Sequence, residues 1–284
     1  MDTNFSSNIS GTILNHQWNK LHDWYEGDGE HIRFIGRFLA PLTAYWLVGG
    51  FFMIVDTFKP NFLTKYKVQP DEEVTMPRLL GALRVVLINH IISVPVVLLF
   101  HWIEIWRGCD MGRDLPSIPR FLIDALGIVL CEEIAFYYSH RLLHHPRLYK
   151  HIHKKHHEWT APCSITAIYC HPVEQIFSNL IPVYLGPLVT GCHTSVQMVW
   201  FFIGLVETCF SHSGYHLPFC PPPEFHDFHH MKFVNNFGAI GLLDRLHNTD
   251  NLFKNSVYSK RRRLLLRFTP ILELYPEDRE KKTK

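Results

Sequence analysis

The sequence lacks several motifs that commonly bind metals or nucleotides. Its seven cysteines contain no C-x-x-C pair, and the chain has neither a G-x-G-x-x-G loop nor a flavin motif. The first absence argues against zinc ribbons and iron–sulfur clusters, and the second leaves no recognisable nicotinamide or flavin site. An odd number of unpaired cysteines favours a reducing compartment. The polar start, MDTNFSSNIS, lacks a signal-peptide core, so we expect a membrane span to direct targeting.

Charge is also sparse and nearly balanced, with a net charge of +2 and 19% charged residues. The basic run at 260–263 is more typical of a membrane-surface or partner contact than of a nucleic-acid site. We therefore expect no nucleic-acid partner.

Histidine, by contrast, is concentrated in one part of the chain. Residues 140–230 hold 14 of the 20 histidines, whereas the 139 residues before them hold only five. These histidines form four groups, which are HRLLHH at 140–145, HKKHH at 153–157, HSGYH at 212–216 and HDFHH at 226–230. Such local enrichment indicates a metal site, because imidazole is a common metal ligand.

The spacing within each group indicates how the imidazoles are shared. Residues three and four apart lie on one face of a helix, so each H-x-x-x-H pair can hold one ion. Each H-x-x-H-H triplet can send two imidazoles to one metal and one to a neighbouring metal. Ten candidate ligands exceed the four of one zinc site, which predicts two metals. The candidates are His140, His144, His153, His156, His157, His212, His216, His226, His229 and His230.

The ligand type narrows the choice of metal. An all-imidazole set suits iron, zinc, copper or nickel better than magnesium or calcium, which prefer oxygen. Iron and zinc are the leading interpretations. Because imidazole binds a metal only when it is neutral, we expect mild acid to release the metal.

Four other histidines lie among or after these groups but do not fit the repeated spacing. We expect each of them to support a ligand from outside or to lie on the surface, rather than to bind metal directly. They are His145, His151, His171 and His247.

Long apolar blocks make up much of the rest of the chain, which is 47% hydrophobic. The blocks cover 38–55, 85–103, 121–138, 176–189 and 196–210. About 20 apolar residues cross a bilayer, so the pattern predicts an all-α integral membrane protein. We expect four to five apolar helices capped by a cytosolic, helical, histidine-rich domain that binds two metals. A large soluble core with buried helices is the alternative.

The positions of the histidines constrain the topology. All four groups must meet on one side of the membrane, so the chain between His157 and His212 crosses it twice or not at all. A hairpin at about 174–211, spanning or deeply inserted, satisfies this condition. The block at 121–138 carries three acidic residues, which are costly in lipid, so it either spans or lies at the interface. The predicted units are 1–119 with two membrane helices, the metal-binding domain 120–270 and a polar tail, 271–284.

The tail ends in KKTK, with Lys281 and Lys282 fourth and third from the end. This register is typical of a dilysine retrieval signal of the endoplasmic reticulum, which is read in the cytosol. We therefore expect a multi-pass protein of that membrane whose metal site and C-terminus face the cytosol.

HRLLHH, HKKHH and HDFHH, in this order and with an apolar hairpin before the last, resemble the motifs of a known superfamily. It is the sterol desaturase and fatty acid hydroxylase superfamily of membrane di-iron enzymes, which includes the C4-methylsterol monooxygenases. The resemblance covers roughly residues 120–270. In that family four histidine motifs hold two metals, and the matching residues here are the ten candidates. Some members space the first pair one residue wider, which leaves His145 as an alternative to His144.

The resemblance implies an oxidoreductase that uses two iron ions and O₂ to hydroxylate a lipid C–H bond. Zinc is an alternative occupant in purified protein. Electrons would come from NAD(P)H through cytochrome b5 and its reductase. The favoured substrate is a C4-methylsterol of sterol biosynthesis, and hydroxylation or desaturation of a fatty acyl or sphingolipid chain is the alternative.

The sequence is also compatible with other interpretations. The segment after the last triplet usually reads W-D-[RK]-[ILF]-F-G-T in methylsterol monooxygenases, whereas residues 243–249 read LDRLHNT, without Trp and Gly. Membership of the superfamily is therefore better founded than C4-demethylation. A metal transporter would place histidines along a path inside its spans, whereas here they lie beside charged residues. A catalytically silent metal-binding scaffold would keep the same ligands.

Overall fold

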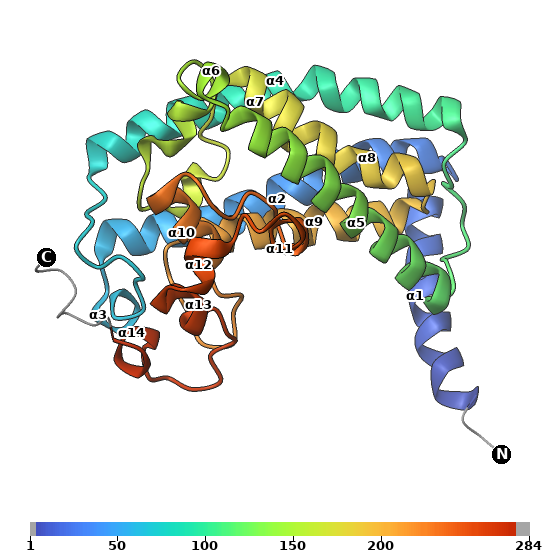
Figure 1. Ribbon diagram of the computed structural model, residues 1–284. Coiled ribbons are helices and arrows are strands. Elements are labelled where there is room, and N and C mark those ends of the chain that lie inside the picture. The colour runs from blue at the N-terminus through green and yellow to red at the C-terminus, as the bar shows by residue number, and fades with distance from the viewer. Residues whose placement is uncertain (1–3, 277–284) are drawn as a thin grey trace, which may run out of the picture.

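All regular secondary structure in the computed structural model, which describes residues 4–276, is helical (Figure 1). Two residues, Lys67 and Tyr215, form an isolated β-bridge within that range. The long helices are α1 (Asn4–Trp24), α2 (Gly29–Phe58), α4 (Met76–Arg107), α5 (Ile118–Leu143) and α9 (Thr194–Ser211). The predicted all-helical fold is confirmed. The tail that carries Lys281 and Lys282 lies outside the described residues.

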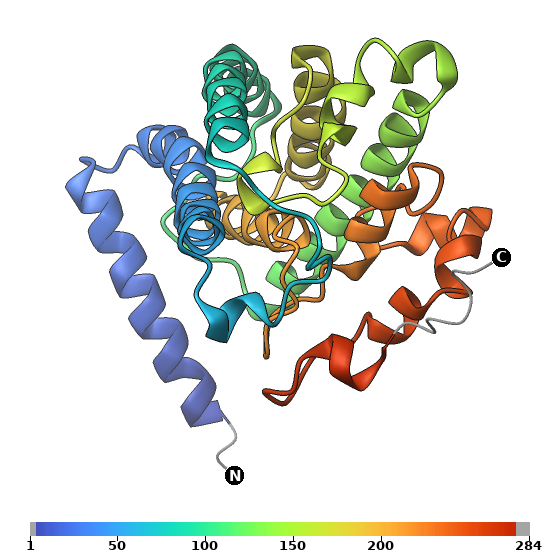
Figure 2. The ribbon, with the colours of Figure 1, turned by 90° about the vertical axis from the view of Figure 1, so that its left-hand side faces the viewer.

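Shorter helices connect the long ones and build a cap at one end of them (Figures 1 and 2). The short α-helices are α3 (Asn61–Thr64), α6 (Pro146–Tyr149), α7 (Pro172–Glu174), α8 (Ile181–Thr190), α10 (Glu224–Lys232), α11 (Leu242–His247), α12 (Asn251–Lys254), α13 (Val257–Arg261) and α14 (Ile271–Leu274). The remaining elements are the 3₁₀ helices η1 (His153–Glu158) and η2 (Ser164–Thr166) and the π-helix η3 (Gln175–Leu180).

Within residues 4–276, three helices, α2, α4 and α9, are long and apolar enough to cross a membrane. This is close to the expected four to five apolar helices, and the other two blocks differ for physical reasons. Helix α5 is 26 residues long but carries three acidic residues. The block at 176–189 is divided, because η3 interrupts the run before α8, which has only 10 residues. The consecutive helical segments α7, η3 and α8 together cover residues 172–190, which is about 28 Å at the α-helical rise and close to the bilayer core of about 30 Å.

Local sequence explains where the spans begin and end. The side chain of Asp28 accepts hydrogen bonds from the main-chain N–H groups of Glu30 and His31, at 2.8 and 3.2 Å, and so caps α2. Gly108 ends α4 with a φ of +75°, and its N–H bonds back to the last turn. Glycine adopts this left-handed conformation without the steric cost that a side chain imposes.

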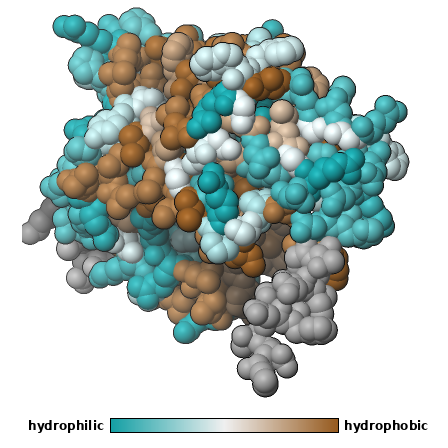
Figure 3. Space-filling model, turned by 90° about the vertical axis from the view of Figure 1, so that its right-hand side faces the viewer, coloured by the Kyte–Doolittle hydropathy of each residue, from teal (hydrophilic) through white to brown (hydrophobic). Residues whose placement is uncertain are grey.

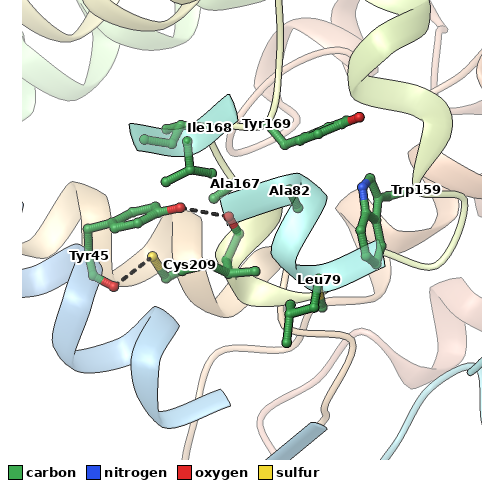
Figure 4. Packing of buried hydrophobic residues seen from close by; sticks show 11 residues of the cluster. Tyr45, Leu79, Ala82, Trp159, Ala167, Ile168, Tyr169 and Cys209 are labelled. Atoms are coloured by element: carbon green, nitrogen blue, oxygen red, sulfur yellow. Dashed lines mark hydrogen bonds between the residues drawn. The ribbon is translucent and has the colours of Figure 1, made fainter. Parts of the chain in front are cut away.

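Helix α9 packs along α2, and the short helix α8 packs along α5. A buried cluster beside them contains Tyr45, Trp159, Ile168 and Cys209 (Figure 4). The hydroxyl of Tyr45 donates to the main-chain oxygen of Ile165 at 2.6 Å. These contacts anchor the segment that follows η1, which includes η2, against the long helices. Helix η1 carries three of the clustered histidines.

Large hydrophobic side chains also lie exposed on the outward faces of α2, α4 and α5. Leu47, Ile91 and Leu122 are 62%, 70% and 59% exposed. Figure 3 shows hydrophobic residues at the surface beside hydrophilic ones on one side of the molecule. An exterior of this kind is expected for helices in contact with lipid, since soluble monomers rarely expose so much apolar surface.

Candidate metal centre

The structure brings nine of the ten predicted ligands together in two groups. The first group consists of His140, His144, His153, His157 and His229. The second group consists of His156, His212, His226 and His230. Within each group the candidate ligand atoms all lie within 4.8 Å of one another. Imidazoles from four separate segments of the chain therefore converge, as the sequence predicts.

Each H-x-x-H-H triplet is divided between the two groups, also as its spacing predicts. The division places His153, His157 and His229 in the first group, and His156, His226 and His230 in the second. The helix type differs between the triplets, because the second lies on α10 whereas the first forms the 3₁₀ helix η1. A one-residue step in either helix turns a side chain by 100–120°, so neighbouring histidines point to different groups.

The segment HSGYH departs from the predicted helical geometry. Helix α9 ends at Ser211, and the chain then turns at Gly214, which has a φ of +70°. The expectation that His212 and His216 form a pair on one helical face is therefore wrong. His212 joins the second group, and His216 lies outside both groups as defined above.

Main-chain carbonyl groups hold five of the clustered imidazoles by Nδ1. The pairs are His140 with Phe237 at 2.7 Å, His156 with Tyr169 at 3.2 Å, His212 with Thr208 at 2.8 Å, His229 with Asn235 at 2.6 Å and His230 with Trp159 at 2.9 Å. A carbonyl oxygen only accepts hydrogen bonds, so each Nδ1 carries the proton. In a neutral imidazole, Nε2 then presents a lone pair.

These Nε2 atoms face one another. The Nε2 of His156 lies 3.4 Å from that of His212, although both rings carry their proton on Nδ1. Two lone pairs do not form a hydrogen bond, so a cation between them is the arrangement that stabilises them. Across both groups these Nε2 separations run from 2.9 to 3.4 Å. Two nitrogens bound to one ion at about 2.1 Å, 90–110° apart, are separated by about 3.0–3.4 Å. The residues therefore fit a metal.

Two buried carboxylates support the site. Glu174 lies 2.8 Å from Nδ1 of His153, and Glu224 lies 2.5 Å from Nδ1 of His216. His216 and Glu224 are fully buried, and Nε2 of His216 has no hydrogen-bond partner in the described structure. A carboxylate on the far nitrogen is a common support for a metal-binding histidine, because it fixes the tautomer and the ring orientation. The sequence gives no local signal for either contact.

Burial keeps the clustered imidazoles neutral. It lowers the pKa of His144 to about 2 and that of His156 to about 4, with the neighbouring histidines adding to the effect on His144. The pKa values of His229 and His230 are also well below the usual value, for the same two reasons. Neutral imidazole is the form that binds metal.

The four histidines that did not fit the spacing lie apart from both groups. His145 is exposed, and its side chain caps α6. The first group therefore contains His144 and not the alternative, His145. His171 caps α7 in the same way, and His151 is exposed. His247 is exposed and stacks on Tyr137.

A second feature that the sequence did not indicate is a clamp on the chain after α10. Glu133 of α5 accepts the N–H groups of Ile240 and Leu243 at 2.9 and 3.0 Å. Asp244 accepts those of Phe237 and Gly238 at 2.8 and 2.7 Å. The clamp fixes the carbonyl group of Phe237, which holds His140. Thus an acidic residue of the third apolar block orients a clustered histidine.

Both groups border one cavity of about 420 Å³. His140 and His153 from the first group, and His156, His212 and His226 from the second, form part of its wall. Away from them the wall is largely apolar, and it includes Phe38, Leu42, Val97, Phe136, Val183 and Leu205. Volumes of about 300–1,000 Å³ with mostly apolar linings are typical of small-molecule sites.

The fold and the site define a class: a helical membrane protein with two candidate metal sites of histidine, beside an apolar cavity. The chain belongs to the fatty acid hydroxylase family. The family model described as fatty acid hydroxylase matches residues 125–249, which contain all four histidine groups. Membership confirms the resemblance seen in the motifs and supports an oxidoreductase that hydroxylates a lipid.

Several proteins are similar over most of this chain. Fatty acid hydroxylase domain-containing protein 2 of Homo sapiens is 46% identical over 273 residues, which cover 94% of this chain and 82% of that protein. Fatty acid hydroxylase ahd1 of Mycosarcoma maydis is 35% identical, with coverages of 89% and 68%. Methylsterol monooxygenase 1 of Danio rerio is 35% identical, with coverages of 70% and 71%. No solved structure matches the chain.

Proposed function

We propose that this protein is a membrane-bound di-iron oxygenase that hydroxylates a lipid, with a C4-methylsterol as the favoured substrate. The observation that carries the proposal is that one apolar cavity reaches both histidine groups. A lipid in this cavity has its apolar body among the helices and one end beside the metal ligands. The family relationship supports the same chemistry.

We assign all ten predicted histidines as ligands. Nine lie in the two groups, and His216 is the tenth because its Nε2 is buried without a partner while Glu224 holds its Nδ1. Iron is preferred to zinc on chemical grounds, because zinc has no redox chemistry and hydroxylation by O₂ requires it. When bound, two ferrous ions activate O₂ for attack on an unactivated C–H bond.

The rest of the chain positions these groups. Carbonyl oxygens and the two carboxylates fix the tautomer of seven of the ten rings, so that their Nε2 atoms point toward the metal. The apolar wall keeps water away from the reacting carbon, which protects a reactive oxidant from side reactions. Each hydroxylation consumes one O₂, two electrons and two protons, and it yields one alcohol and one water. We assign the electron supply to NAD(P)H through cytochrome b5 and its reductase.

The name of the Danio rerio relative, methylsterol monooxygenase 1, supports a methylsterol as substrate. The name of the Mycosarcoma maydis relative, fatty acid hydroxylase ahd1, supports a fatty acyl chain. We favour the sterol because a cavity of about 420 Å³ is compact and bordered by aromatic rings such as Phe38, Phe136 and Phe201. Hydroxylation or desaturation of a fatty acyl or sphingolipid chain is the competing outcome. We also propose that the protein lies in the endoplasmic reticulum membrane with its metal site facing the cytosol.

Reconstitution of the full chain tests the proposal. Protein loaded with ferrous iron, supplied with cytochrome b5, its reductase and NADPH, is expected to oxidise a C4-methylsterol at the methyl group. Metal analysis is expected to find two irons per chain. Turnover of sphingolipid alone would overturn the sterol assignment. Protein that binds two metals yet consumes no O₂ with any lipid would support the silent scaffold instead.

A further inference from the structure

The chain around the first histidine group is strongly basic. Between Glu133 and Glu158 the sequence has five Lys or Arg residues and no Asp or Glu. Arg141, Arg147, Lys150 and Lys154 are exposed, and Lys232 of α10 is exposed as well. None of these five side chains lies within 4.0 Å of a carboxylate oxygen in the described part of the chain. We call Arg141, Arg147, Lys150, Lys154 and Lys232 the basic rim.

The rim is connected to the first histidine group through aromatic side chains. Tyr149 is half-buried in the middle of the same basic segment. Its ring centroid lies 5.6 Å from that of His144, 6.1 Å from that of His153 and 5.9 Å from that of His157. A single side chain thus touches three of the five imidazoles of this group and also reaches the surface.

Phe233 completes this aromatic layer next to Lys232. Its ring lies 6.5 Å from that of Tyr149 and 4.9 Å from that of His157. The residue has a φ of +64°, which is costly for a side chain of this size. A strained conformation persists only where its surroundings impose it. The packing around Phe233 therefore holds its ring against His157.

We propose that the basic rim is the docking site of a one-electron carrier protein with an acidic face, and that electrons enter the first histidine group past Tyr149. This proposal rests on the proposed function, which needs two electrons for each hydroxylation. At each step the carrier would lose one electron to the metal that the first histidine group would hold. Two docking events therefore supply one turnover, and the protons come from water.

Charge complementarity selects the partner. Unpaired exposed cations attract an acidic protein over a distance and raise the rate of encounter, an effect that salt weakens. Anionic lipid headgroups would also be attracted. A lipid contact, however, gives no role to the half-buried Tyr149 that links the rim to three ligands, whereas an electron carrier requires a short path of this kind.

The test compares two double charge reversals in the full-length protein. The test variant is Lys150→Glu with Lys154→Glu. The control variant is Lys65→Glu with Arg267→Glu, two exposed residues outside the basic rim. In Figure 2 the chain near α6 lies at the top of the view, whereas the segments that carry Lys65 and Arg267 lie in its lower half. Each variant is assayed with the haem domain of cytochrome b5 as the carrier, and with dithionite as a small reductant.

The test variant is expected to raise the KM for the carrier by about ten-fold and to flatten the salt dependence, since rim charges act mainly on association. Its kcat, its metal content and its single-turnover yield with dithionite should match the control. An unchanged KM and unchanged salt dependence would overturn the proposal. The proposal would also be overturned if the test variant lost activity in a way that depends on anionic lipid in the bilayer rather than on the carrier concentration.

Binding of the carrier separates this proposal from the proposed function. If neither electron source supports turnover, the oxygenase assignment fails, but the affinity of the cytochrome b5 domain for the two variants is still measurable. A Kd about ten-fold weaker for the test variant alone supports docking at the rim. Equal Kd values for both variants would refute it.

Discussion

Glu224 and His216 form a fully buried carboxylate–imidazole pair, with Oε1 of Glu224 2.5 Å from Nδ1 of His216. Glu174 and His153 form a matching pair at 2.8 Å in the first histidine group. In both pairs the second carboxylate oxygen has no hydrogen-bond partner in the described structure. Burying a carboxylate is costly, so the pairs are best explained as supports for metal-binding rings.

Replacing Glu224 by Gln should therefore weaken metal binding. The amide keeps the size of the side chain but loses the charge that raises the basicity of the ring, and changes of this kind typically cost 10–100-fold in metal affinity. Competition with a chelator, followed by metal analysis, measures the effect. Glu72→Gln, at an exposed position, is the control. Equal affinities in both variants would show that Glu224 does not support a ligand.

Removal of single histidines distinguishes ligands from bystanders. His157→Ala and His229→Ala should each abolish turnover and lower the metal content, because both imidazoles belong to the first group. His151→Ala should retain most activity, because His151 is exposed and outside both groups. Turnover and metal per chain are the measurements. Equal losses in all three variants would mean that the groups are not the site.

The metal-free protein should lose stability as the pH falls below about 6.5. The native pKa values of His144 and His156 are depressed to about 2 and about 4, so below pH 6.5 only the unfolded chain takes up their protons. Each such histidine lowers the free energy of unfolding by about 1.4 kcal/mol per pH unit. Burial raises the pKa of Asp227 to about 7, so below pH 7 the folded protein binds a proton there that the unfolded chain does not. This raises the free energy of unfolding as the pH falls and offsets the effect of one histidine.

Thermal unfolding of chelator-treated protein between pH 7.5 and pH 5 measures this slope. His156→Gln should be less sensitive to pH than the parent, because its contribution is removed. A melting temperature that rises on acidification would contradict the expectation that the clustered imidazoles are buried as neutral groups.

Glu133→Gln should destabilise the chain after α10. The amide has one acceptor oxygen in place of two, so one of the N–H groups of Ile240 and Leu243 loses its partner. An unsatisfied buried donor costs roughly 1–3 kcal/mol. Thermal unfolding is the measurement, with exposed Glu273→Gln as the control. A melting temperature equal to that of the control would show that the clamp is dispensable.

Filling the cavity should separate substrate binding from metal binding. Leu205→Trp adds a ring to the wall of the cavity, so it should reduce turnover of a lipid by more than about ten-fold while two metals stay bound. Leu246→Trp, at a position that is 74% exposed, should have little effect. Full activity in Leu205→Trp would place the substrate elsewhere.

Part of this architecture could be read from local patterns. The apolar blocks predicted the helices, because a long run of apolar residues is stable only away from water. The spacing of the triplets predicted that each would serve two groups, and α10 and η1 follow that division although η1 is a 3₁₀ helix. HSGYH shares the H-x-x-x-H spacing of a helix but forms a turn, because Gly214 takes a positive φ there.

The sequence by itself determined the helical class, the family and the histidines that converge, since these depend on residue type and on short spacings along the chain. Only the tertiary structure decided that Glu174, Glu224 and Glu133 support the rings, and that Tyr149 joins a basic surface to them. These contacts depend on how distant segments pack. Carboxylates and aromatic rings are common in any sequence, so their roles emerge only when folding places them beside a ligand.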